Sequence, residues 1–185
     1  MEPNEKEELV VVLDFLPNGY PFDNRPSFRK TPIAQVMSKK FFTLLEIIPK
    51  KDVTIQAMEE LYIGEGKRDK VHHVACRIGM DRLTQTAKGE LEFVIEKLVK
   101  ENPQRFLDFF NKCGPISTRM HQIELLPGIG KKHMWVIIET RQEKPFESFE
   151  DIKSRISAIP DPLKIVVRRI LMELNNEDKY KIFVR

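Results

Sequence analysis

The stretch LLPGIGKKH, residues 125–133, places a proline, two glycines and two lysines in one tight turn directly after two leucines. Apolar residues resume at Ile137 and Ile138, at a spacing that predicts a helix. Glycines permit positive φ and close backbone approach, so the N–H groups at the start of that helix can face a phosphate. Lys131 and Lys132 add positive charge at the same spot. The stretch therefore predicts a turn that holds a nucleic-acid backbone without reading its bases.

The same run resembles the helix-hairpin-helix motif, in which a hairpin of the form glycine, hydrophobic residue, glycine joins two short helices. Gly128, Ile129 and Gly130 supply that hairpin here, and the motif would span residues 117–140. The chain departs from the motif at Met134, where the family usually has alanine, and this puts the crossing of the two helices in doubt. We predict that phosphate is bound by Gly128, Ile129, Gly130, Lys131 and Lys132.

A second, degenerate copy of the motif is expected at residues 148–174. Its hairpin, an Asp-Pro pair, contains no glycine, so we expect it to pack rather than to bind. Lys164, Arg168 and Arg169 can extend a basic face, although an ordinary solvated helix surface is an equal alternative. The residues whose spacing is similar to that of the first copy are Ile156, Ile159, Pro160 and Val166.

Helical periodicity covers most of the second half of the chain, from about residue 86 onward. One helix, at residues 117–126, would lead directly into the glycine turn. The tail DKYKIFVR alternates well enough to be a strand and could return to the N-terminal sheet. We expect helices at residues 86–102, 103–112, 117–126, 131–144, 148–157 and 161–175.

The first half of the chain reads as short strands separated by turns, with a proline-rich loop at residues 17–32. Residues 34–50 can supply one long or two short strands, and GEGKRDK, residues 64–70, has the composition of a hairpin connection. A small barrel or a curled sheet is the simplest closure of about five such strands, and the oligonucleotide-binding (OB) barrel is one form of it. The other strands are expected within residues 8–16, 53–64 and 70–79.

At the scale of the whole chain, the order of these features resembles an uncharacterised archaeal family, described as a domain of unknown function. In that family an S1-like OB barrel is fused to a helix-hairpin-helix region. The resemblance implies an α+β fold, with a small OB/S1-like β-barrel at residues 1–87 and an all-α helix-hairpin-helix domain at residues 88–185. It also implies an archaeal source and a role connected with RNA, translation or transcription. This resemblance is the sole ground for favouring RNA over DNA.

Composition sets the broad class. The chain has 185 residues, enough for one large or two small domains, and a formal net charge of +3, which permits nucleic-acid binding without demanding it. Because it has only two cysteines, we expect a protein of a reducing cellular compartment, with both thiols free. The acidic start does not match a signal peptide, and no apolar run suggests a membrane span. We expect a cytoplasmic protein that does not bind membranes.

Two loops are further candidates for nucleic-acid contact. Lys67, Arg68 and Lys70, followed by His72 and His73, can lie at the rim of a barrel, where loops grip single strands, or can form a solvated hairpin tip. The proline-rich loop brings together an aromatic side chain and several cations, a mixture that can stack a base while neutralising phosphate, although the aromatic side chain can equally pack into the protein's own core. Its candidates are Arg25, Phe28, Arg29 and Lys30.

Metal binding and catalysis find little support. His72, His73 and Cys76 lie close in sequence, and Cys113 with His121 could complete a zinc set. A regular strand, however, puts His72 and Cys76 on one face and His73 on the other, and the sequence has no Cys-x-x-Cys pair. The acidic residues form no cluster typical of a two-metal nuclease, and no nucleophile or dinucleotide motif occurs. We therefore expect no metal, no cofactor and no enzymatic activity. Trp135, beside the glycine turn, is expected to be a packing residue.

The sequence thus predicts a nucleic-acid-binding protein with largely sequence-independent backbone contacts through the hairpin and the barrel loops. The alternative is a protein-interaction adaptor that docks a ribosome or polymerase component in a transcription, translation or ribosome-assembly complex. The oligomeric state is left open.

Overall fold

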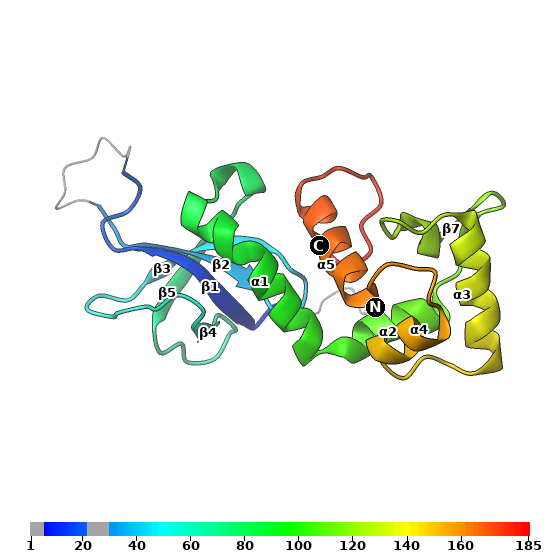
Figure 1. The fold of residues 1–185 in the computed structure, drawn as a ribbon. Helices are drawn as coiled ribbons and strands as arrows, with labels where there is room; N and C mark the ends of the chain where they lie inside the picture. The colour runs from blue at the N-terminus through cyan, green and yellow to red at the C-terminus, as the bar shows by residue number, and fades with distance from the viewer. Residues whose placement is uncertain (1–5, 22–29) are drawn as a thin grey trace. The chain divides into compact units, whose positions relative to one another are not determined.

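The computed structural model describes residues 6–21 and 30–185 of the chain. The chain forms two compact units. The first unit consists of Met1–Val94 and Lys181–Arg185, and the second unit consists of Ile95–Tyr180. Strands β1 to β5 belong to the first unit and helices α2 to α5 to the second (Figure 1). Within the described residues, none of the helices has the length and apolar character needed to cross a membrane.

The first unit is built on one antiparallel sheet of five strands in the order β4, β1, β2, β3, β5. The sheet is curled into a half-barrel, and in the described part of the chain its two edges are β4 and β5. Residues 34–50 supply two short strands, because a turn with Phe42 at φ 54° separates them. The strands are β1 (Leu9–Leu16), β2 (Ile33–Ser38), β3 (Leu44–Pro49), β4 (Glu60–Tyr62) and β5 (Val71–Arg77).

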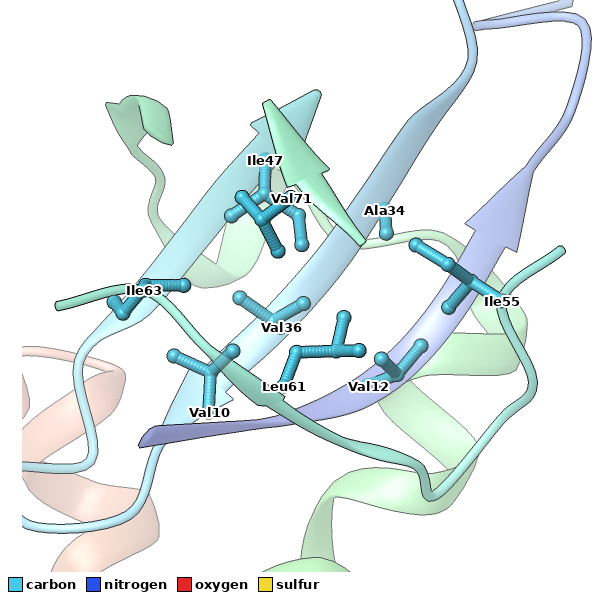
Figure 2. Close-up of a cluster of buried hydrophobic side chains, with 9 residues drawn as sticks. All are labelled: Val10, Val12, Ala34, Val36, Ile47, Ile55, Leu61, Ile63 and Val71. Atoms are coloured by element: carbon cyan, nitrogen blue, oxygen red, sulfur yellow. The ribbon is translucent and has the colours of Figure 1, made fainter. Parts of the chain in front are cut away.

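Buried side chains on the inner face of the curled sheet form the core of the first unit (Figure 2). Val10 and Val12 of β1 belong to this cluster, while Val11 and Leu13, which are also fully buried, alternate with them on the opposite face. β1 is therefore covered on both faces, which explains its continuous apolar sequence. The cluster consists of Val10, Val12, Ala34, Val36, Ile47, Ile55, Leu61, Ile63 and Val71.

Buried Gln35 of β2 connects the sheet to the start of helix α1, Gln85–Glu101. Its Nε2 donates to the main-chain oxygen of Arg82 (2.9 Å), and its Oε1 accepts from the Thr84 N–H (2.9 Å). Thr84 caps the helix, because its Oγ1 accepts from the Ala87 N–H (3.0 Å). A polar side chain at a buried strand position thus fixes where α1 begins.

Two expectations for the first unit were wrong, one because of the strand order and one because of a β-bulge. Residues 64–70 do not connect a β-hairpin, because β4 and β5 lie at opposite edges of the sheet. His72 and His73 do not lie apart on opposite faces: the pairing of β3 with β5 shifts register there, and their Nδ1 atoms are 2.7 Å apart. A bulge of this kind breaks the two-residue alternation from which the opposite placement was predicted.

The second unit is not all-α, because the helix predicted at residues 117–126 does not form. These residues lie in a short β-hairpin, β6 and β7, and in one 3-10 turn, η3. His121 caps η3 from an extended backbone, so helical structure begins only after it. Pro127 favours extended backbone at Leu126 (ψ 128°), so the turn ends there. The elements are α2 (Pro103–Lys112), β6 (Pro115–Ser117), β7 (Met120–His121), η3 (Gln122–Leu125), α3 (Lys131–Glu143), α4 (Phe149–Arg155) and α5 (Pro162–Leu174).

The tail DKYKIFVR does not form the expected strand, but its last five residues, Lys181–Arg185, belong to the first unit. The Arg185 N–H donates to the main-chain oxygen of Phe41 (3.2 Å), and the Arg185 guanidinium lies 4.1 Å from the centre of the Phe41 ring. The main-chain oxygen of Arg185 accepts from Thr43 Oγ1 (3.1 Å) and from the guanidinium of Arg77. The chain therefore leaves the first unit within α1, after Val94, and returns to it at Lys181.

Candidate nucleic-acid interface

The glycine hairpin, residues 127–130, has the backbone geometry that its sequence predicts. Gly128 has φ +84°, a conformation that side chains with a Cβ rarely adopt. Ile129 is buried and anchors the turn, since its N–H donates to the main-chain oxygen of Leu126 (3.1 Å). Gly130 is extended (φ −93°, ψ 178°) and exposed, and it forms the N-cap of α3. The hairpin thus turns its apolar residue inward and its glycines outward.

The first turn of α3 offers main-chain N–H groups and positive charge together. Its first helical bond runs from the Met134 N–H to the Gly130 oxygen (2.9 Å), so the N–H groups before Met134 have no acceptor within the helix. Gly130 has no side chain to cap them. Lys131 and Lys132 are both exposed beside them. Met134 itself is buried, so the larger residue at this motif position is absorbed by the core of the second unit.

The turn η3 holds the chain that enters the glycine hairpin. His121 Nδ1 accepts from the Ile123 N–H (3.1 Å), and Glu124 Oε2 accepts from the His121 N–H (2.9 Å), which together form a capping box. Burial lowers the pKa of His121, and the positive charge of Arg141 lowers it further. The acceptor role of Nδ1 requires that ring nitrogen to be unprotonated.

Arg169 of α5 fixes the end of η3 from the other side. Its side chain is 1% exposed, and its Nη1 donates to the main-chain oxygen of Leu125 (2.8 Å). Its Nε pairs with buried Glu173 (2.8 Å), and its Nη1 also pairs with Asp178 (2.9 Å). Nη2 donates to the main-chain oxygen of Tyr180. Arg169 is therefore a positioning residue, and the prediction that it extends a basic surface was wrong.

A second hairpin, residues 156–161, repeats the turn of the first with a different chemistry at the helix start. The Ile159 N–H donates to the Ile156 oxygen (3.5 Å), as Ile129 does to Leu126, and both of these isoleucines are buried. The N-cap of α5, however, is Asp161, whose carboxylate accepts from the N–H groups of Leu163 (3.0 Å) and Lys164 (3.3 Å). At α5 a carboxylate thus already occupies N–H groups of the first turn, whereas the corresponding N–H groups of α3 are open.

The two hairpins contact each other. A Cβ atom built on Gly128 would lie 3.3 Å from Cγ of Pro160, so the glycine allows close approach of the second hairpin. The starts of α3 and α5 follow these residues by two or three positions, which places both helix N-termini near the contact. Lys164 and Arg168, in the first two turns of α5, are exposed. The structure thus brings together the predicted residues of both hairpins within the second unit.

A groove lies beside the glycine hairpin, between the β6–β7 hairpin and α3. Its volume is about 320 Å³, and Trp135, which is 58% exposed, forms part of its wall. The expectation that Trp135 packs in the core was therefore wrong. Arg119, which the sequence reasoning did not single out, also lines the groove, as does Lys131. The predicted helix at residues 117–126 hid this arrangement, because it would have scattered Arg119 and its neighbours around a helix surface.

The candidates in the first unit have mainly local partners. Arg68 Nε donates to the main-chain oxygen of Gly64 (2.9 Å), and Lys70 pairs with Glu59. The Lys70 Nζ also donates to the main-chain oxygen of Thr54 (3.2 Å). Lys67 is exposed.

The candidates in the proline-rich loop fall largely outside the described residues. Arg25, Phe28 and Arg29 lie there, and Lys30, the first residue after the gap, is half-buried.

Cys76 and Cys113 are both free thiols, and burial raises the pKa of Cys113. Among the described residues, no group of three or more histidine, cysteine or acidic side chains is arranged to hold a metal ion.

Comparisons with known proteins give one family. The model of a family described as "Protein of unknown function (DUF655)" matches residues 6–185. The chain is 47% identical over 186 residues to the "Uncharacterized protein MJ0038" of Methanocaldococcus jannaschii, covering 100% of this chain and 82% of that protein. It is also similar to the crystal structure of Af1531 from Archaeoglobus fulgidus, with 48% identity, a TM-score of 0.89, and coverage of 97% of this chain and 100% of that one. The expected likeness to an uncharacterised archaeal family is thereby confirmed.

Proposed function

The chain belongs to the DUF655 family of proteins of unknown function, and on this premise we propose that it binds nucleic acid through the glycine hairpin. In this proposal the main-chain N–H groups at the start of α3 hold a phosphate, and Lys131 and Lys132 neutralise it. The contacts are to the backbone, so binding is largely independent of base sequence. RNA is favoured over DNA by family resemblance alone.

The difference between the two hairpins carries the proposal. Gly130 caps α3 without a side chain, whereas Asp161 caps α5 with a carboxylate that occupies the corresponding N–H groups. An anion is stabilised at an open, positively charged helix N-terminus and is repelled where a carboxylate already lies. The two turns share one type of hydrogen bond but differ at the helix start, where α3 leaves its N–H groups open to a phosphate beside Lys131 and Lys132.

The rest of the architecture supports a more specific assignment. We infer that the two hairpins form a pair of helix-hairpin-helix units, of which the first binds and the second packs, with η3 in place of the leading helix of the first unit. We also infer that the first unit is an OB-like barrel, because the OB fold is a curled sheet of five strands. Proteins with this fold bind single strands. Lys67 stands free to contact a strand on this unit, whereas Arg68 and Lys70 mainly stabilise their loop.

Fluorescence anisotropy tests the proposal. Labelled single-stranded RNA, duplex RNA, single-stranded DNA and duplex DNA are titrated at about 50 and 200 mM salt with wild type and with Lys131→Glu/Lys132→Glu. A site that neutralises about three phosphates loses roughly twentyfold in affinity for a single strand, and roughly fortyfold for duplex DNA, over this range of salt. The best ligand among the four identifies the nucleic-acid class. Circular dichroism checks that the variant is folded.

A matched control separates a local site from net charge. Lys112→Glu/Lys144→Glu changes the charge by the same amount, but Lys144 follows α3 at its opposite end, roughly 20 Å from Lys131 at 1.5 Å per residue. The control should retain binding while Lys131→Glu/Lys132→Glu loses it. If no ligand binds below about 100 μM, or if both variants bind like wild type, the hairpin assignment fails and a protein partner becomes the leading hypothesis.

A further inference from the structure

We propose that the groove between the β6–β7 hairpin and α3 holds an unstacked base of a single-stranded nucleic acid, with Trp135 as its stacking surface. This inference rests on the proposed function of the glycine hairpin and goes beyond it, because it predicts a single-stranded ligand rather than a duplex. It also assigns a role to residues outside the predicted hairpin.

Trp135 is placed to receive a base from a strand held at the start of α3. It follows Lys131 by four residues, so the two side chains lie on the same face of the helix, about one turn of 5.4 Å apart along its axis. Both side chains line the groove. A nucleotide whose phosphate is bound at the helix N-terminus therefore has its base directed along this face, toward the indole.

The lining of the groove suits a base more than it suits another phosphate. Met120, Met134 and Ile138 give it apolar surface next to the indole, and methionine adapts readily to aromatic partners. Arg119 and Lys131 supply positive charge, while Glu124, which also lines it, accepts from the His121 N–H. Its volume of about 320 Å³ lies at the lower end of the usual range for ligand pockets, about 300–1,000 Å³.

Exposure of an aromatic side chain is not sufficient for this inference, because single exposed apolar residues are common. Phe93 of α1 is exposed to a similar degree, 61% against 58% for Trp135, but it is not among the residues that line the groove. Trp135 differs in lining a groove together with a cation, Lys131. Bases in a duplex are stacked on each other and cannot enter such a groove, whereas those of a single strand can.

The test varies the base and the tryptophan separately. The ligands are a 12-nucleotide oligouridine, an abasic ribose-phosphate strand of the same length, and a 12-base-pair RNA duplex, each also as its DNA counterpart. The chain has one tryptophan, so its intrinsic fluorescence reports on Trp135, and anisotropy of labelled strands gives the affinity. The variants are Trp135→Ala, Trp135→Phe, Phe93→Ala as the matched control, and Lys131→Glu/Lys132→Glu.

Wild type should bind the oligouridine about five- to a hundredfold more tightly than the abasic strand, with quenching of tryptophan fluorescence. Trp135→Ala should lower the affinity for oligouridine to that for the abasic strand and leave the latter unchanged. Trp135→Phe should keep most of the preference, and Phe93→Ala should behave as wild type. Lys131→Glu/Lys132→Glu should weaken both strands alike.

Two results would overturn the inference without touching the proposed function. One is that Trp135→Ala binds both strands as wild type does, and the other is that it weakens both equally while Lys131→Glu/Lys132→Glu abolishes binding. The proposed function itself fails if no strand binds or if the lysine variant binds like wild type. In that case the base site falls with it, and the groove becomes a candidate surface for a protein partner.

Discussion

At Gly130 the chain offers the first N–H groups of α3 without a side chain of its own to occupy them. The position does not require glycine for steric reasons, because its φ is −93° and a Cβ there would meet no heavy atom within 4 Å. Serine, aspartate and asparagine are the usual residues at an N-cap, since their side chains accept these N–H groups. The absence of a capping side chain is therefore a cost in stability, which binding of a phosphate would offset in the proposed function.

Gly130→Asp should have opposite effects on stability and on binding. The new carboxylate would copy the cap that Asp161 provides, so we expect the free energy of unfolding to stay level or to rise by a few tenths of a kcal/mol, roughly. Loss of a charge-assisted contact should weaken nucleic-acid binding by about ten- to a hundredfold. Urea unfolding and anisotropy measure the two effects.

The control for Gly130→Asp is Asn102→Asp, which adds the same charge at the N-cap of α2. This variant should bind like wild type. If Gly130→Asp binds nucleic acid with unchanged affinity, the N–H groups of α3 are not the phosphate contacts, even if Lys131→Glu/Lys132→Glu weakens binding.

At the scale of elements, arginine side chains of α3 and α5 join segments that lie far apart along the chain. Arg169 connects α5 to the end of η3 and to the chain around Tyr180. Arg141 of α3 does the same for the end of α2, because it donates to the main-chain oxygens of Phe110 (2.9 Å) and Cys113 (2.9 Å). These contacts satisfy carbonyl groups that a helix or turn leaves open at its end. The geometry of the glycine hairpin therefore depends on residues that touch no ligand.

Arg169→Met should destabilise the second unit strongly. It removes the ionic partner of Glu173, which is fully buried, so the free energy of unfolding should fall by about 3–5 kcal/mol. Arg168→Met, one residue earlier and exposed, should change it by less than about 0.5 kcal/mol. Denaturant unfolding followed by circular dichroism makes the comparison. Equal stability of the two variants would mean that the buried network does not hold η3.

The capping box of η3 should make stability depend on pH. The pKa of His121 is lowered in the folded protein from its ordinary value of 6.5, so the unfolded chain binds the proton more readily. Its contribution to stability is present above pH 6.5 and is lost as the pH falls below that value toward the folded pKa. Protonation at Nδ1 would also remove the acceptor of the Ile123 N–H.

Melting temperatures of wild type and His121→Asn between about pH 5 and 7.5 test this dependence. Asparagine can cap η3 but does not titrate, so the variant should lose less stability on acidification than wild type. Parallel melting curves for the two proteins across this range would exclude His121 as the titrating group.

Elements whose sequence pattern is local could be predicted from the sequence. The glycine hairpin, α3 and the helix predicted at residues 148–157, which forms as α4 with Ser148 Oγ accepting from the Asp151 N–H (3.0 Å), depend on residues a few positions apart. The segment at residues 117–126 did not follow, because its apolar spacing fits a helix while its hydrogen bonds are made by a strand partner and by His121. The groove at Trp135 depends on that hairpin and was missed for the same reason. Arg169 and Glu173 stand four residues apart among the apolar residues of α5, a pattern that could have indicated a buried pair.

At the scale of the whole molecule, the order of residues along the chain does not match the order of the compact units. The first unit contains residues from both ends of the described chain, and the second unit is inserted between them. Curvature of the sheet and the return of the tail are long-range features. The alternation of DKYKIFVR suggested a return to the N-terminal sheet, and Lys181–Arg185 do belong to the first unit. They form no strand there: Arg185 hydrogen-bonds to Phe41 and lies against its ring, and Phe183 and Val184 are buried.

Phe183→Ala should therefore destabilise the first unit although it lies far from β1 to β5 in sequence. Phe183 is 3% exposed, and truncation of a buried phenylalanine costs about 3–5 kcal/mol. Hydrogen exchange should show faster exchange of the amides of β2 and β3, with the amides of α3 and α5 affected less. Lys181→Ala, an exposed neighbour, serves as the control. Uniform acceleration in both units would contradict a specific role in the first.

The return of Lys181–Arg185 to the first unit affects the order in which the two units can be completed during synthesis on the ribosome. Translation at about 5–20 residues per second delivers residues 95–180 over roughly 4–17 s after Val94 has been added. All residues of the second unit, including the glycine hairpin, have then been synthesised, while the half-barrel that was begun first still lacks its last five residues. The unit made first is thus completed last: its five strands have all been synthesised by then, but the buried side chains of Phe183 and Val184 are still missing from it.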